Sequence, residues 1–220
     1  MSDSFYKYRS FNRFTNNIIL NSSLYFSSPN NFNDPFDCQL SYKDKYTKRE
    51  IKDFFIDLLK QNSHENYRLK DLLKNPSSIL MWSHYSDNHK GLVFEFKPFK
   101  NSLCFETPIP PISVKYVKSY IPLSYAHTRE ELHKYQQDIL LTKFVDWRYE
   151  EEYRVLHLEE QGERKFEKGE LLSIIFGAEA TDKNINDMIL LRKKNNFTHV
   201  KFKKAKKVFG LLSLSFEDIN

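Results

Sequence analysis

Two glutamates and an arginine near residue 150 are the first side chains whose types and spacing could do chemistry. They lie in the segment from Trp147 to Val155. In a β-strand, side chains two residues apart share a face, so Glu150, Glu152 and Arg154 would project together. Neighbouring carboxylates repel unless a cation or ligand hydroxyls lie between them. The pattern predicts either a ligand-binding face, with Trp147 beside it, or a solvated strand face that Arg154 neutralises.

A polar loop is the second candidate. The segment from Ser27 to Asp37 contains two prolines and a cluster of Asn, Asp and Ser residues, which exclude regular structure. Side chains on a loop at a strand end can position a ligand. They can equally form Asx-turns that only hold the loop's own backbone. The polar residues concerned are Ser27, Ser28, Asn33, Asp34 and Asp37.

The segment from Met81 to Gly91 contains two histidines, His84 and His89. Their spacing of five fits neither one face of a helix, as in many zinc sites, nor one face of a strand, so we expect no metal site here. His84 is a candidate for hydrogen bonding or acid–base chemistry, and the alternative is a structural histidine in the core.

A run of lysines near the end of the chain is the fourth candidate. Such a stripe can contact a phosphate backbone. It can also be a solvated edge that discourages pairing between strands. The lysines are Lys201, Lys203, Lys204, Lys206 and Lys207.

Composition narrows the classes of function. The chain has 220 residues, a net charge of +5 and only five glycines. Neither a G-x-G-x-x-G nor a G-x-x-x-x-G-K motif occurs, so Rossmann dinucleotide binding and P-loop hydrolysis are disfavoured. Aromatic residues make up 15% of the chain, and they can fill a core or line a pocket for flat rings.

The compartment is predicted from the same counts. No apolar run approaches the roughly 20 residues that cross a bilayer, and the first residues lack the apolar stretch of a signal peptide. Two cysteines, Cys38 and Cys104, cannot build a disulfide framework. We therefore expect a cytoplasmic protein with no membrane partner.

These residues must be positioned by strands and helices, and the expected order of those elements predicts a single α+β domain with a split, mainly antiparallel sheet and inserted helices. A core from about 6 to 177 would be followed by a helix and basic strands at 181–216. Expected strands are 5–8, 18–26, 78–84, 91–96, 112–117, 147–155, 153–158, 171–176, 200–203 and 208–214. Expected helices begin at Thr47, about Glu65, Thr128 and Thr181, and a Thr cap is present at three of the four. The second would extend to Leu73, the third would include Phe144, and the fourth would end at about Arg192.

Several segments together resemble the bacterial domain-of-unknown-function 2971 family. The resemblance extends from about Tyr6 to Gly177. It rests on the segments 6–10, 24–29, 33–37, 81–85, 89–91 and 147–154, which occur in that order. The family's name assigns no activity.

The chain is also distantly similar to ADP-ribosyltransferases of the arginine–serine–glutamate type. Arg9, Ser27-Ser28 and the Glu150-x-Glu152 pair occur in the order of that motif. The resemblance implies that Arg9 holds the phosphates of NAD, that the serines brace its nicotinamide ribose, and that Glu152 stabilises the oxocarbenium-like transition state. It also implies an ADP-ribosyltransferase-like fold. Taking this resemblance together with the candidate segments above, we expect Glu150 and Glu152 to be catalytic and a cleft to be lined by Tyr8, Arg9, Ser27, Ser28, Asn33, Asp34, Asp37, His84, Tyr85, Trp147 and Arg154.

The favoured interpretation is an NAD-dependent ADP-ribosyltransferase or NAD glycohydrolase with no metal, acting on nucleic acid or protein, as a toxin or anti-phage effector. One alternative is a Mg²⁺-dependent nuclease, in which Asp34, Asp37, Glu150 and Glu152 converge on the metal. Another is a non-enzymatic nucleotide-binding or partner-binding module, in which Glu150, Arg154 and Asp34 form a structural network.

Overall fold

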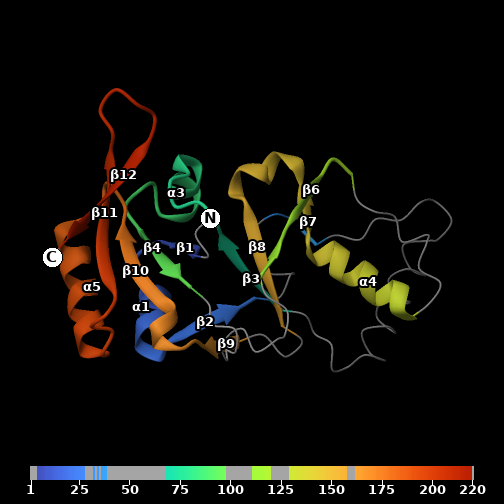
Figure 1. The fold of residues 1–220 in the computed structure, drawn as a ribbon, viewed down its shortest axis with the longest axis horizontal. Coiled ribbons are helices and arrows are strands. Elements are labelled where there is room, and N and C mark those ends of the chain that lie inside the picture. Colours follow the sequence, from blue (N-terminus) through green and yellow to red (C-terminus); the bar gives the residue numbers. More distant parts are fainter. Residues whose placement is uncertain are drawn as a thin grey trace.

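The computed structural model describes residues 4–27, 32, 34, 36–38, 68–97, 111–119, 129–157 and 162–219 (Figure 1). The strands are β1 (Phe5–Arg9), β2 (Ser23–Phe26), β3 (Arg68–Leu73), β4 (Leu92–Phe96), β5 (Ile112–Ser113), β6 (Lys115–Val117), β7 (Thr142–Phe144), β8 (Glu152–His157), β9 (Gly162–Lys165), β10 (Leu171–Phe176), β11 (Lys201–Lys207) and β12 (Leu214–Ile219). The helices are α1 (Arg13–Asn21), α3 (Ile79–Tyr85), α4 (Arg129–Leu140) and α5 (Asp182–Lys194), with 3₁₀ turns η4 (Val145–Glu150) and η5 (Lys168–Glu170).

The described strands form one large sheet and two small ones. The large sheet has eight strands in the order β12-β11-β10-β4-β1-β3-β8-β5, and β2–β9 and β6–β7 are separate pairs. Only β10–β11 and β6–β7 pair in parallel. A mixed fold with a mainly antiparallel sheet is thus confirmed. The predicted split of the sheet is wrong, because all eight strands belong to one continuous sheet. Strands β1 and β3 are joined in it by a single residue pair, Tyr6–Leu73.

Alternation along the strands divides the core between the two faces of the sheet. On β4, Phe94 and Phe96 belong to the cluster that includes Ile18 and Ile19 of α1 and Ile185 and Met188 of α5. Val93, between Leu92 and Phe94, packs instead with Met81 and Trp82 of α3. Side chains of period two therefore bury α1 and α5 on one face and α3 on the other.

Two glycines let the turn before β4 lie against the end of β10. A Cβ atom at Gly177 would lie 2.0 Å from the backbone oxygen of His89, and one at Gly91 would lie 2.2 Å from that of Arg9. The Gly177 amide donates to the Gly91 carbonyl at 2.9 Å. Because neither glycine has a side chain, the backbone segments can pack this closely, and α3 lies beside the end of β1.

Several sequence predictions of local structure are wrong. Residues 78–84 form α3 rather than a strand, because Ser78 caps a helix by accepting from the Met81 amide and a short apolar run fits either structure. Residues 18–26 are divided between α1 and β2 by Ser22, which has φ of 50°. Residues 68–73 are a strand because they pair with β8. Residues 208–213 form a turn, where Gly210 has φ of +78°.

Other predictions are confirmed or fall outside the described residues. Thr181 caps α5 by accepting from the Asn184 amide, and β1, β4, β10 and β11 lie where expected. The helix expected from Thr47 and the Thr128 cap lie outside the described residues. No helix among the described residues is long and apolar enough to cross a membrane.

Candidate functional site

A cavity of about 570 Å³ opens where β1 and β3 part. Beyond the Tyr6–Leu73 pair the two strands share no further residue pair, and Tyr8 and Arg9 at the end of β1 line the cavity. Its other walls come from α1, β2, α3, β7 and the start of β8. Eight residues predicted from sequence lie in its wall: Tyr8, Arg9, Ser27, Asp37, Tyr85, Glu150, Glu152 and Arg154.

The two glutamates reach the cavity by a different backbone path from the one predicted. Glu150 ends the 3₁₀ turn η4, and Glu152 begins β8. Between them Glu151 has φ of 48° and its side chain is exposed. A single left-handed residue thus sends both neighbours inward, whereas a continuous strand from 147 to 155 was expected. The predicted shared face holds only for Glu152 and Arg154.

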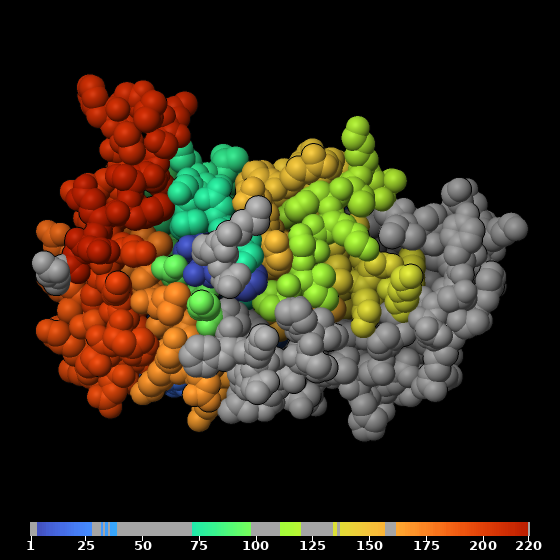
Figure 2. All heavy atoms as spheres, viewed as in Figure 1, coloured from blue at the N-terminus to red at the C-terminus, as the bar shows by residue number. Residues whose placement is uncertain are grey.

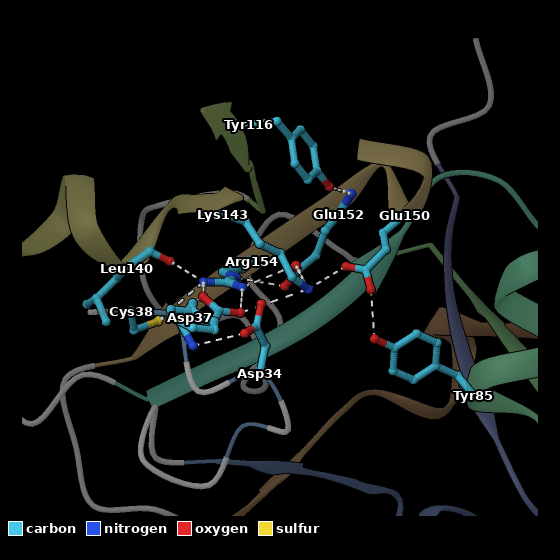
Figure 3. Close-up of polar contacts among 11 residues, drawn as sticks. Asp34, Asp37, Cys38, Tyr85, Tyr116, Leu140, Lys143, Glu150, Glu152 and Arg154 are labelled. Carbon is cyan, nitrogen blue, oxygen red and sulfur yellow. Dashed lines mark hydrogen bonds and ion pairs between the residues drawn. The ribbon is translucent and has the colours of Figure 1, made fainter. Parts of the chain in front are cut away.

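Arg154 is the centre of a buried network of ions (Figure 3). Its two terminal nitrogens donate to the two oxygens of Asp37, at 2.9 and 2.6 Å. Its Nε donates to Glu152 at 2.6 Å, and Nη1 also donates to the Leu140 carbonyl at 2.8 Å. The paired, planar donors of arginine match a carboxylate in this way, and lysine could not replace them.

Lys143 of β7 is the second cation of the network (Figure 3). Its Nζ donates to Glu150 and, at 3.2 Å, to Glu152, and it lies 3.9 Å from Asp37. Three carboxylates and two cations therefore share one buried cluster, with one net negative charge when all are ionised. We call these five residues (Asp37, Lys143, Glu150, Glu152 and Arg154) the ion cluster.

Two tyrosines extend the ion cluster. The Tyr85 hydroxyl donates to Glu150 Oε1 at 2.7 Å, on the cavity side. The Tyr116 hydroxyl accepts from the Glu152 amide at 2.8 Å and so holds the first residue of β8. Glu150 therefore has one oxygen on a neutral hydroxyl, while both oxygens of Glu152 are held by cations.

Burial and neighbouring charges have opposing effects on the pKa values of Glu150 and Lys143. Burial raises the pKa of Glu150 above its ordinary value, against the lowering effects of Lys143 and Tyr85. Burial alone would lower the pKa of Lys143, but the charges of Glu152 and Glu150 outweigh it and the net shift is upward. A carboxyl with a raised pKa at a cavity wall is a candidate for proton transfer.

Another part of the cavity wall is cationic and aromatic. Arg9 is half-buried, and its Nε is shielded from solvent and meets no hydrogen-bond acceptor among the described residues. Tyr8 packs edge-on against Trp82 and donates to the Asn75 carbonyl at 2.9 Å. Phe14 and Tyr25, 58% and 44% exposed, present ring surface at the same cavity. This wall can hold an anionic group and a flat ring.

Of the remaining predicted site residues, those that the structure describes are not part of the cavity wall. Asp34 accepts from the Phe36 amide at 2.9 Å and shapes the turn before Asp37, so it does not join the network proposed for Glu150 and Arg154. His84 is exposed. Trp147 lies under the ammonium of Lys143, 4.9 Å from ring centre to Nζ. Ser28 and Asn33 lie outside the described residues.

Sequence reasoning missed Lys143 and Tyr116. Lys143 was placed within an expected helix, but α4 ends at Leu140 and Lys143 lies on a short strand. The signal was a lysine inside the run from Ile139 to Val145, in which only Thr142 and Lys143 are not apolar. Tyr116 had no distinguishing signal, because its role depends on a backbone amide.

The structure bears on two predicted contacts: the metal site of the nuclease alternative and the contact of the lysine run with phosphate. Among the described residues no group of three or more His, Cys, Asp and Glu side chains is arranged to hold a metal ion. The carboxylates do converge, but the ammonium of Lys143 occupies the position between them. Three of the five lysines of the basic run, Lys203, Lys206 and Lys207, form ion pairs with carboxylates of the chain.

A family model described as "Protein of unknown function (DUF2971)" matches residues 81–155. That is 75 of the 220 residues, and the segment begins in α3 and ends in β8, so it contains Tyr85, Lys143, Glu150, Glu152 and Arg154. The match supports the resemblance to this family for that part of the chain. No curated protein and no solved structure matches, so the similarity to ADP-ribosyltransferases gains no support.

We expect Asp37→Ala to destabilise the protein by about 3 to 5 kcal/mol, because it leaves a buried guanidinium without its paired carboxylate. The matched control is Asp218→Ala, which removes an exposed carboxylate from β12 and should change the free energy of unfolding by less than about 0.5 kcal/mol. Urea denaturation followed by circular dichroism measures both. Equal effects of the two substitutions would show that the ion cluster does not depend on Asp37.

Proposed function

We propose that the chain binds a nucleotide of the NAD class in the cavity and cleaves the bond between nicotinamide and ribose. The ADP-ribosyl group then passes to water or to an acceptor. The single observation that carries the proposal is convergence: Arg9, Ser27, Glu150 and Glu152, which are far apart in sequence, line the same cavity. The comparisons add nothing for or against this activity, so the support comes from the geometry of the chain itself.

The two walls of the cavity suit the two ends of such a ligand. A volume of about 570 Å³ falls within the range of small-molecule sites. The guanidinium of Arg9 lines the cavity and can donate to a phosphate, a charge-assisted bond that is stronger than a neutral one. Tyr25 and Phe14 can stack on a base or on nicotinamide.

The ion cluster supplies what the bond cleavage needs. When the C1′–N bond breaks, its electron pair leaves with nicotinamide and the ribose carbon becomes positive. The net negative charge of the ion cluster would stabilise this cation electrostatically. Attack of water at C1′ then releases a proton, which the Glu150 carboxylate can accept because only a hydroxyl and one lysine hold it. Glu152, held by two cations, would supply fixed charge rather than move a proton.

The first test is mass spectrometry of NAD incubated with the purified chain and its variants. We expect nicotinamide release by the wild type, and a loss of roughly 100-fold or more in Glu150→Gln, as for removal of a general base. The control is Glu163→Gln, a cavity carboxylate that bonds Asn21 and Ser23 away from the ion cluster. Intact NAD with the wild type, with and without cell lysate as acceptor, would reject the reaction.

Binding is tested separately from turnover. Arg9→Gln should weaken ADP-ribose binding about tenfold, because a charged donor to phosphate is lost. Arg13→Gln is the matched control, since Arg13 is exposed and lies over the ring of Phe14 rather than in the cavity wall. Isothermal titration calorimetry measures both. If the two variants bind ADP-ribose equally well, Arg9 does not contact the phosphates.

The pH dependence should report on Glu150. A base must be ionised, so activity falls as pH falls through its pKa, and the raised pKa of Glu150 places this fall above the range of an ordinary carboxyl. Tyr85→Phe removes a hydrogen bond that lowers this pKa, so the acidic limb should move to higher pH. Tyr8→Phe, which removes a hydroxyl bonded to the Asn75 carbonyl, should leave the limb in place. The measurement is the pH profile of nicotinamide release.

A non-enzymatic nucleotide-binding module is the second candidate, and one observation favours it. Both oxygens of Glu152 are neutralised by Lys143 and Arg154, as expected of a structural network. In that case ADP-ribose would bind through Arg9 while NAD stayed intact. The nuclease alternative would instead require a metal to displace the Lys143 ammonium from among the carboxylates, and chelation with EDTA would then abolish activity.

A further inference from the structure

The hairpin of β11 and β12 extends beyond the sheet to which it belongs. Strand β10 pairs only with residues 201–204 of β11. The pairs Ala205–Phe216, Lys206–Ser215 and Lys207–Leu214 continue with no third strand beside them among the described residues. The hairpin therefore projects from the body of the molecule as a two-stranded ribbon, at the upper left of Figures 1 and 2.

The end of this ribbon, residues 208–213, carries bulky apolar side chains in full contact with solvent. We call it the hairpin tip. Phe209 is 103% exposed, Leu212 97% and Leu211 66%. The turn is ordered by bonds from the Leu211 amide to the Val208 carbonyl and from the Val208 amide to the Ser213 carbonyl, both at 3.1 Å. An exposed group of large apolar side chains marks a contact with another molecule or a membrane.

Within the hairpin segment 205–216 itself, the charged side chains are of one sign. Residues 205–216 contain Lys206 and Lys207 and no aspartate or glutamate. Both lysines form ion pairs at the surface, with Glu217 and Glu179, and all four side chains are more than half exposed. Such pairs contribute little and can be exchanged for other anions.

We propose that the hairpin tip inserts shallowly into the surface of an anionic lipid bilayer. The apolar side chains would enter the boundary between headgroups and acyl chains, and Lys206 and Lys207 would lie at the depth of the anionic headgroups. The projection of the ribbon favours a lipid bilayer as the partner, because a protruding element can insert into a flat surface without the rest of the protein colliding with that surface.

A nucleic acid fits the same surface less well. Its affinity would rest on cations that contact phosphate, yet the hairpin tip itself contributes none and instead exposes Phe209, Leu211 and Leu212. The proposal concerns a peripheral contact. It departs from the sequence-based expectation of no membrane partner, which considered only apolar runs long enough to span a bilayer, and it does not depend on the proposed function.

The experiment is sedimentation of the full chain with vesicles of phosphatidylcholine alone or of equal parts phosphatidylcholine and phosphatidylserine. We expect binding to the phosphatidylserine vesicles that weakens as salt rises. Phe209→Asp and Leu212→Asp should each reduce partitioning about tenfold or more, as expected for losing one buried apolar side chain. The matched control, Leu190→Asp, replaces a half-exposed leucine of α5 and should bind like the wild type.

Three results would overturn the proposal. The first is no binding to either vesicle, and the second is equal binding by Phe209→Asp and Leu190→Asp. The third is a dimer in analytical ultracentrifugation, or a complex with DNA or RNA, that Phe209→Asp abolishes while vesicle binding is absent. Unchanged unfolding midpoints of the variants show that they fold, and NAD turnover is measured on the same samples, so failure here is distinguishable from failure of the proposed function.

Discussion

The rest of the site depends on the compensation of one buried charge, the guanidinium of Arg154. Only 1% of this side chain is exposed, and an unpaired charge at such a position would cost several kcal/mol. Its partners come from separate parts of the chain: Asp37 from a loop, Glu152 from the same strand and the Leu140 carbonyl from the end of α4. Satisfying Arg154 therefore fixes the loop around Asp37 and the end of α4 relative to β8. The cavity walls follow from that arrangement.

Burying the charges of the ion cluster carries a large desolvation free energy, and the location of the ion cluster gives a reason for burying them. Apolar side chains of the same volume are often at least as stabilising as a buried ion pair. Here the ion cluster lies at a cavity wall and retains an excess of one carboxylate, with Glu150 held by Tyr85 on the cavity side. Fixed charge beside a space of about 570 Å³ is suited to a ligand that carries or develops positive charge. The same charge in a closed core would have no such use.

Sequence patterns predicted which residues belong to the site better than they predicted how those residues are arranged. Glu150 and Glu152 could be selected from their spacing and Ser27 from its polar loop, whereas Arg9 was selected through the resemblance to ADP-ribosyltransferases. Their convergence could not be derived, since it depends on β1 and β3 parting after Tyr6 and Leu73 and on the left-handed Glu151. Lys143 was missed because a helix and a short strand read alike in the run from Ile139 to Val145. Likewise α3 was taken for a strand, because its apolar residues are too few to show a period. Long elements with caps, such as α5, were predictable because the Thr181 side chain and the apolar face agree.

The cavity and the hairpin tip arise from the same property of the large sheet, namely that neighbouring strands do not end together. Between β1 and β3 the pairing stops after one residue pair, and the space beyond it is lined by side chains instead of closed by backbone bonds. Between β10 and β11 the inner strand stops first, and β11 continues with β12 as its only partner. A strand that outruns its neighbour must pair elsewhere or expose its backbone, and here it turns at Gly210 and pairs with the returning chain. One mismatch thus makes a concave site with buried charge, and the other makes a convex apolar one. The two sites share no residues.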